Sequence, residues 1–346
     1  MRPEAGKGAS ASQLIRTVAW DRRPALEPEH RSGAMTCACA AGVDVGGEFL
    51  DVGLAPSGAV FRAGNTAAGV EAVIARLKRE GASKVVLESI GGPGRRLVRS
   101  LAKAGFEVGV VDPKRIKALR IAEGRRAKTD TLDARLIARF ALVMQDAARP
   151  VPDDKAFEIK ALSTRRRQLV EMAAKEKTRL RQTLDEPVAD SCRQMIAILS
   201  QERARVETLL RGELLASQAS RDKETLLLTI PGVGPAVSMT LLADLPELGS
   251  LDRRAIANLA GLAPHPNQSG SRTSQAHIGG GRPCVRTALY MAAVNAIRSD
   301  KGFKREYLAL RQAGKPAKVA LVAIARKIVV AANVMIKTGL PWQKTA

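Results

Sequence analysis

The chain has 346 residues and carries 56 Lys and Arg against 34 Asp and Glu, which gives a formal net charge of +22. A chain of this length is too long for one small core, so two or three domains are expected. No apolar run approaches the roughly 20 residues that span a bilayer, and no lipidation signal is present. The surplus of positive charge therefore favours nucleic acid over an acidic membrane surface as the partner. Aromatic residues make up only 3%, so we expect contacts to backbone phosphates rather than base stacking.

The cysteines and the N-terminal segment exclude two further classes of protein. The four cysteines are Cys37, Cys39, Cys192 and Cys284. They lack the C-x-x-C spacing of a zinc site, and scattered thiols are typical of a reducing cytoplasm. Residues 1–38 have no continuous apolar stretch, so they predict a disordered tail rather than a signal peptide. Met35 is an alternative start, which the intact mass of the natural product would test.

Residues 39–150 predict an α/β domain. Residues 39–62 alternate as two or three strands, and Thr66 is the expected N-cap of the helix that follows. The later elements are a buried strand at 84–88, a helix at 97–104, a strand at 106–111 and a helix at 130–144. The order β-β-β-α-β-α-β-α indicates an α/β layer with a partly parallel sheet.

Residues 151–221 predict a helical arm. Pro150 and Pro152 mark its start, and two long amphipathic helices lie on either side of Pro187. Near-heptad spacing of their apolar residues favours an antiparallel hairpin or coiled coil that assembles subunits. A solvated helical linker is the alternative, because the heptads are few.

Residues 222–346 predict a mostly helical domain with a Gly- and Ser-rich stretch between Ser269 and Gly281. Pro231-Gly232-Val233-Gly234 between two short helices is typical of a helix-hairpin-helix. Its glycines, Gly232 and Gly234, allow a tight turn, and the next helix N-terminus can face a DNA phosphate. An ordinary Gly-Pro turn is the alternative. We favour DNA contact because the chain is basic.

Four carboxylates are candidate metal ligands: Asp44, Glu88, Asp130 and Asp133. Asp44 lies inside an apolar strand, where a carboxylate is costly unless paired or metal-bound, and Glu88 ends another such strand. Asp130 and Asp133 follow Thr129 in a first helical turn, about 5–6 Å apart. Such a set is typical of RNase H-like folds, in which carboxylates hold two Mg²⁺ ions about 3.5–4 Å apart. Taken singly, each acid also fits a capping or turn role.

Basic residues flank these acids in every predicted domain. The candidate nucleic-acid contacts are Lys114, Arg115, Arg165, Arg166, Arg282 and Arg286. A charge run is usually a solvated face, but its recurrence favours tracking of a nucleic-acid backbone. Gly42 to Gly47 also resembles the phosphate loop of sugar kinases in the actin-like ATPase group, although no second phosphate loop or adenosine loop follows. From its chemistry alone Ser269 is a loop serine, with no G-x-S-x-G elbow around it.

Taken together, the motifs resemble the DEDD transposases of bacterial insertion sequences, a group that includes the pilin-gene inverting recombinase. The matching series spans roughly residues 40–340 and comprises Gly42-Val43-Asp44-Val45, Glu88 with Gly91, Lys128-Thr129-Asp130-x-x-Asp133-Ala134, Ile230-Pro231-Gly232-Val233-Gly234-Pro235, Leu259-Ala260-Gly261-Leu262-Ala263-Pro264 and Ser269-Gly270. The chain departs from the group at two places. Gly46 and Gly47 stand where a small residue and a Lys are common, and Ile90 and Pro93 where Thr and Tyr are common.

The resemblance implies an RNA-guided DNA recombinase. It implies a RuvC-like metal site at Asp44, Glu88, Asp130 and Asp133, with Mg²⁺ or Mn²⁺ bound. It also implies that Ser269 is a nucleophile forming a phosphoserine link to DNA, with Ser271 and Ser274 as alternatives. A structured guide RNA and a homodimer or homotetramer are the implied partners. The rival interpretations are a junction-resolving metal nuclease and an inactive nucleic-acid-binding relic.

Overall fold

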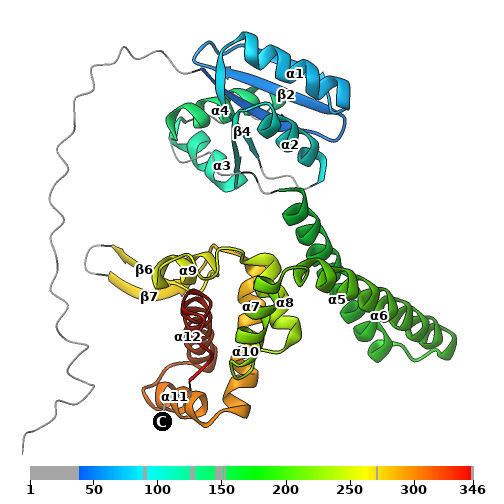
Figure 1. The fold of residues 1–346 in the computed structure, drawn as a ribbon, viewed down its shortest axis with the longest axis vertical. Coiled ribbons are helices and arrows are strands. Elements are labelled where there is room, and N and C mark those ends of the chain that lie inside the picture. Colours follow the sequence, from blue (N-terminus) through cyan, green and yellow to red (C-terminus); the bar gives the residue numbers. More distant parts are fainter. Residues whose placement is uncertain are drawn as a thin grey trace, which may run out of the picture. The chain divides into compact units, whose positions relative to one another are not determined.

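The structure is a computed structural model that describes residues 39–88, 92–124, 129–144, 151, 153–269 and 272–343. The chain divides into two compact units at the bond between Val151 and Pro152 (Figure 1). The predicted tail, residues 1–38, lies outside the described residues. The finer division of the second unit into an arm and a C-terminal domain stays a prediction.

Unit 1 contains a five-stranded sheet in the order β3-β2-β1-β4-β5. Its strands are β1 (Cys39–Val45), β2 (Phe49–Ala55), β3 (Val60–Gly64), β4 (Ala82–Glu88) and β5 (Glu107–Val111). The first three strands form an antiparallel meander, and β4 and β5 run parallel to β1. The mixed sheet confirms the predicted α/β layer and is consistent with an RNase H-like domain.

The described residues of unit 1 also form four helices. They are α1 (Ala67–Arg79), α2 (Arg95–Lys103), α3 (Pro113–Ala122) and α4 (Asp130–Val143), and a 3₁₀ turn, η1 (Gly92–Gly94), precedes α2. The expected N-caps are confirmed, because the hydroxyls of Thr66 and Thr129 accept hydrogen bonds from Gly69 N and Leu132 N. Helix α3 was not predicted, although Asp112 caps it and a proline occupies its first position.

Helix α4 lies directly on the backbone of β1 and β2. A Cβ added to Gly42 would stand 2.0 Å from Ala138 N, and one added to Gly53 would stand 2.5 Å from Ala134 O. Gly42 and Gly53 are themselves opposite each other in the β1–β2 ladder. Only glycine leaves room for a helix at this distance, so these two positions fix which face of the sheet α4 covers.

Unit 2 is mostly helical. Its elements are α5 (Asp154–Gln182), α6 (Glu186–Leu214), α7 (Gln218–Leu228), α8 (Pro235–Asp244), α9 (Arg253–Leu259), β6 (Pro264–Ser269), β7 (Arg272–Ile278), α10 (Pro283–Ser299), α11 (Lys301–Gln312) and α12 (Ala317–Thr338). One large core joins α7 to α12, with buried residues concentrated on α10 and α12. The β6–β7 hairpin corrects the sequence prediction, which placed mostly helix and a Gly- and Ser-rich stretch here.

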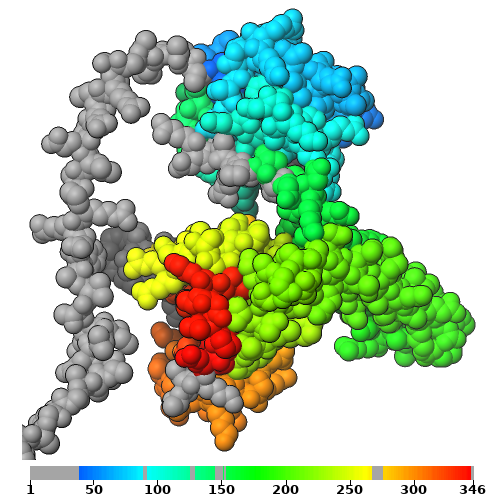
Figure 2. Space-filling model, in the orientation of Figure 1, coloured from blue at the N-terminus to red at the C-terminus, as the bar shows by residue number. Residues whose placement is uncertain are grey.

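The predicted helical hairpin is present as α5 and α6, which pack against each other around Leu169, Leu199 and Val206. The pair stands out from the rest of unit 2 in Figures 1 and 2. Its root is fixed on α8, where the buried carboxylate of Asp244 accepts hydrogen bonds from Lys160 Nζ and, at 2.6 Å, from Ser163 Oγ.

Helix α12 qualifies the sequence prediction about membranes. By length and composition alone, Ala317–Thr338 could cross a bilayer. Among the described residues, this is the one helix that meets both criteria. Half of its most apolar window is nevertheless buried against unit 2. Ile324, Ile328 and Val329 are fully buried in the core of that unit. Its apolar character therefore fits a core helix.

The proposed helix-hairpin-helix motif corresponds to the turn between α7 and α8. Gly232 has φ +84°, and a Cβ there would stand 2.2 Å from Ala292 O on α10. This glycine thus lets the turn pack closely on the core. Gly234 is the N-cap of α8 and has open space where a Cβ would be. Two helices and a glycine turn are present, but DNA contact by this turn stays a prediction.

Candidate functional site

Asp44 and Glu88 lie side by side at the ends of two parallel strands. The β1–β4 ladder ends with the pair Val43 and Leu87, and the next residue on each strand is one of the two acids. Gly42 faces α4, and Asp44 is two residues further along β1, so the side chain of Asp44 points to the same face because side chains alternate along a strand. Glu88 is beside Asp44 on the parallel strand β4 and points to this face too. Both acids are half-buried. The two strand carboxylates therefore share the face that α4 covers.

A third strand carboxylate belongs to this face. Asp51 on β2 is opposite Asp44 in the antiparallel ladder and is only 7% exposed. Arg62 on β3 donates from Nε and Nη2 to the two carboxylate oxygens of Asp51, both at 2.9 Å. This bidentate pair is the strong form of a charge-assisted hydrogen bond.

Arg62 also connects the strands to helix α4. Its Nη2 lies 3.4 Å from Asp130 Oδ2. The hydrogen bond to Asp51, and then the charges of Asp51 and Asp130, raise the pKa of the Arg62 guanidinium above its ordinary value. A permanently charged arginine thus stands between acids of two elements and offsets part of their mutual repulsion.

Asp133 is held by a different arginine. Arg120 on α3 donates from Nη2 to Asp133 Oδ1 at 2.7 Å, and both side chains are largely shielded from water. Asp133 is 8% exposed. Since a buried carboxylate without a partner is strongly destabilising, Arg120 makes the buried position of Asp133 tolerable in this structure.

The convergence of these four acids on a metal ion stays a prediction. The structure brings Asp44 and Glu88 to the face against which the Asp130–Asp133 turn of α4 packs. Within the described part of the chain, however, no three His, Cys, Asp or Glu side chains form a group that could hold a metal ion. Asp130 and Asp133 are paired with arginines instead. The donor set is made of carboxylates alone, which suits a hard cation such as Mg²⁺.

Sequence reasoning missed three residues of this site: Asp51, Arg62 and Arg120. Asp51 carried the same signal as Asp44, a carboxylate in an apolar strand. Arg62 and Arg120 carried no local signal. Their role depends on strand register and on how α3 packs against α4.

Ser269 lies in unit 2, at the end of β6. Its backbone pairs with Arg272 of β7 across the hairpin. The side chain of Ser269 and all of Ser271 lie outside the described residues, and Ser274 is described only by its backbone pairing with Asn267. The choice of nucleophile among these serines stays a prediction.

The six basic candidates differ in their surroundings. Arg166 pairs with Glu207 across the α5–α6 hairpin at 2.8 Å, and Arg282 pairs with Glu247. Arg286 donates to Gly280 O at 2.8 Å, and Arg115 lies 5.0 Å from the ring centre of Phe140. These four side chains have structural contacts. Lys114 and Arg165 are exposed, and nucleic-acid binding by all six stays a prediction.

Two family models match the chain. Residues 41–188 match the DEDD transposase model of IS110 elements, described as "Transposase", and residues 224–308 match "Transposase IS116/IS110/IS902 family". Both matches define a DNA-recombining enzyme of the transposase class. The chain belongs to the IS116/IS110/IS902 family of insertion-sequence transposases. This membership confirms the predicted resemblance and displaces the sugar-kinase alternative.

Curated relatives agree with the family. The chain is 27% identical over 264 residues to the "Pilin gene-inverting protein" of Moraxella bovis, covering 75% of this chain and 82% of the relative. The protein of the same name from Moraxella lacunata matches equally well over the same shares. The "Putative transposase y4rJ" of Sinorhizobium fredii is 26% identical over 336 residues, covering 79% of this chain and 84% of the relative.

Proposed function

We propose that this transposase cuts and exchanges DNA strands with a carboxylate-bound metal in unit 1 and a serine nucleophile on the β6–β7 hairpin of unit 2. The observation that carries the proposal is the shared face of Asp44 and Glu88, covered by a helix whose first turn holds Asp130 and Asp133. Carboxylates that share one face of a sheet can hold a cation, and a bound cation attracts the phosphates of a nucleic acid, which the net charge of +22 on the chain also favours.

Asp44, Glu88, Asp130 and Asp133 would hold Mg²⁺ or Mn²⁺. A bound divalent cation polarises phosphoryl oxygens and lowers the pKa of an attacking hydroxyl. Arg120 pairs with Asp133, and Arg62 contacts Asp130 while it is held by Asp51. If Asp133 turned to a cation, the Arg120 guanidinium would be left to stabilise negative charge that develops on the DNA, while Arg62 would keep its pair with Asp51.

The proposed reaction of the serine is a transesterification that does not consume water. Ser269 Oγ attacks a DNA phosphorus and loses its proton. The bond from phosphorus to one deoxyribose oxygen breaks, and that oxygen leaves as an alcohol after taking up a proton. One phosphodiester bond has been replaced by another of similar free energy. A second deoxyribose hydroxyl can therefore displace the serine and join the exchanged strands.

A structured guide RNA is the further proposed partner. Its support is the resemblance to the RNA-guided group together with the net charge of +22. Base pairing between guide and DNA would deliver sequence specificity, while Lys and Arg side chains contact phosphates. We place the activity in the cytoplasm, where free thiols and bacterial DNA occur together.

The carboxylate proposal is tested by replacing Asp44 with Asn. We expect strand exchange on element-end DNA to fall about 100-fold or more, since one electrostatic contributor to the transition state is lost. DNA binding should be unchanged in a gel-shift assay. Glu48→Gln is the matched control, because it removes one negative charge from an exposed side chain in the adjacent turn. Full activity of Asp44→Asn would contradict the proposal.

Assembly through the α5–α6 hairpin is supported by apolar side chains on the outside of α6. Val188, Met195 and Ile198 are 43–58% exposed, and their spacing places them on one side of the helix. Ile198→Glu should weaken self-association at least tenfold in sedimentation experiments, because a charge would enter the apolar contact. Ser200→Glu, at an exposed position on another side of α6, should leave self-association unchanged. Equal self-association of the two variants would contradict assembly through this face of the hairpin and would favour a solvated helical linker.

A further inference from the structure

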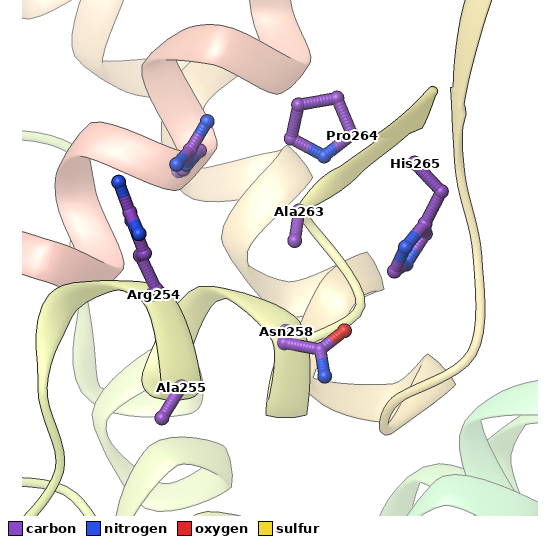
Figure 3. A pocket seen from close by; sticks show the side chains of 7 residues that line it. Arg254, Ala255, Asn258, Ala263, Pro264 and His265 are labelled. Atoms are coloured by element: carbon purple, nitrogen blue, oxygen red, sulfur yellow. The ribbon is translucent and has the colours of Figure 1, made fainter. Parts of the chain in front are cut away.

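A pocket opens at the base of the β6–β7 hairpin. It is lined by residues of α9, the start of β6 and α12, and its volume is about 440 Å³. Figure 3 shows Arg254 rising from α9 on one side and Asn258 and His265 on the other. Arg326 of α12 completes the polar lining, and small apolar residues fill the space between. The volume is in the range of small-ligand sites, too small for a duplex.

The lining carries positive charge and no carboxylate. Arg254 and Arg326 are permanent cations, His265 adds a ring nitrogen, and Asn258 adds an amide. No hydrogen bond or ion pair of the four side chains is found among the described residues. Two arginines in one pocket without an acid between them repel each other, so a bound anion would stabilise the arrangement.

The acid closest in sequence is already used. Asp252 caps α9 by accepting hydrogen bonds from Ala255 N and Arg254 N, both at 2.7 Å. These backbone hydrogen bonds lower the pKa of its carboxyl group, so the carboxylate stays with the helix end. The charge of Arg254 adds to this lowering, but neither Arg254 nor Arg326 forms an ion pair with a carboxylate of the described residues.

The hairpin base is fixed tightly enough to position a ligand. Gly261, which follows α9, and Gly281, which follows β7, have positive φ, and a Cβ on Gly281 would stand 2.3 Å from Gly261 N. Arg282 N also donates to Leu259 O at 2.9 Å. The pocket thus lies on a rigid support at one end of β6. Ser269 lies four residues further along that strand, about 13 Å away.

We propose that this pocket binds a backbone phosphodiester of the DNA strand that reaches the hairpin, a few nucleotides from the exchanged bond. Arg254 and Arg326 would hold the phosphate oxygens, with Asn258 and His265 donating further hydrogen bonds. The inference rests on the proposed function, because the DNA strand must reach Ser269. It adds a positioning site that sets which phosphate meets the serine.

The test couples protein variants to single neutral phosphates. Fluorescence anisotropy would measure binding of the full chain to a labelled element-end duplex, in which one phosphate at a time is replaced by an uncharged methylphosphonate. We expect one or two positions to weaken wild-type binding several-fold. Methylphosphonates at these positions should weaken binding of Arg254→Ala and Arg326→Ala much less, because those variants have already lost the contact to the phosphate. The salt slope should drop by about 1 for each lost contact.

Arg253→Ala is the matched control, since it removes the same charge from the exposed neighbouring residue. It should retain the full methylphosphonate effect. Arg326→Lys, which keeps the positive charge, and thermal denaturation of each variant would show whether a loss of DNA binding results from unfolding. Absence of coupling at every position, while wild type binds DNA, would overturn the pocket but leave the proposed function. Coupling confined to an RNA probe would also overturn it. Failure of wild type to bind the duplex would instead refute the proposed function.

Discussion

Ser269→Ala should abolish a covalent protein–DNA adduct that the wild-type chain forms on element-end DNA. The adduct is expected because a phosphoserine diester survives denaturation in detergent, and it migrates as a shifted band on a gel. Without the hydroxyl no such bond can form, and strand exchange should fall below detection, at least about 10³-fold. DNA binding should be retained, because one loop hydroxyl contributes little to backbone contacts.

Two further serines provide the controls for this experiment. Ser271→Ala and Ser274→Ala should each still form the adduct, since only one hydroxyl is the nucleophile. Adduct loss in one of them, with Ser269→Ala active, would move the nucleophile along the hairpin. If the Ser269→Ala variant still cuts DNA and neither it nor the wild type forms an adduct, the protein would be a junction-resolving nuclease that uses water. A chain inactive in every variant and in wild type would be a DNA-binding relic.

The elements that sequence predicted well are those with a local signal. Alternation of apolar residues located β1 and β2, a continuous apolar run located β4, and the caps Thr66 and Thr129 located the starts of α1 and α4. Asp44 was recognised from a local signal too, since a carboxylate in an apolar strand stands out in a single segment, although Asp51 carries the same signal and was missed.

The elements that sequence missed depend on distant contacts or on weak patterns. β6 has the polar sequence Pro264-His265-Pro266-Asn267-Gln268, which lacks the apolar alternation of a half-buried strand. The pairing of Arg62 with Asp51 follows from the β2–β3 register, and that of Arg120 with Asp133 from tertiary packing. Neither can be inferred from spacing, so the sequence predicts metal ligands at Asp130 and Asp133, where the structure has ion pairs with arginines.

This difference has a consequence for metal binding. A cation that takes Asp130 and Asp133 must replace two guanidinium contacts, one of them largely buried. If these acids bind metal as proposed, their metal affinity in the absence of DNA should be lower than that of four unpaired acids. A phosphate that accepts hydrogen bonds from Arg120 would offset this cost, so metal and DNA binding should favour each other.

Gly42→Ala should destabilise unit 1 by about 3 kcal/mol or more, because the new methyl group would overlap the backbone of α4. The added Cβ would stand 2.0 Å from Ala138 N and 2.4 Å from Ile137 C, and backbone atoms cannot rotate aside as side chains can. Moving α4 away from the sheet would expose apolar residues such as Ile137 and Phe140, and would carry Asp130 and Asp133 away from Asp44.

Hydrogen exchange of the full chain, read by mass spectrometry, would measure this change where it occurs. Amides of β1 and α4 should exchange much faster in Gly42→Ala, while those of unit 2 keep their wild-type rates. Gly47→Ala is the matched control, since no atom lies within 4 Å of a Cβ at that position. It should exchange like wild type. Wild-type protection of α4 in Gly42→Ala would mean that the helix does not rest on this glycine, and the shared face of the acids would lose its structural basis.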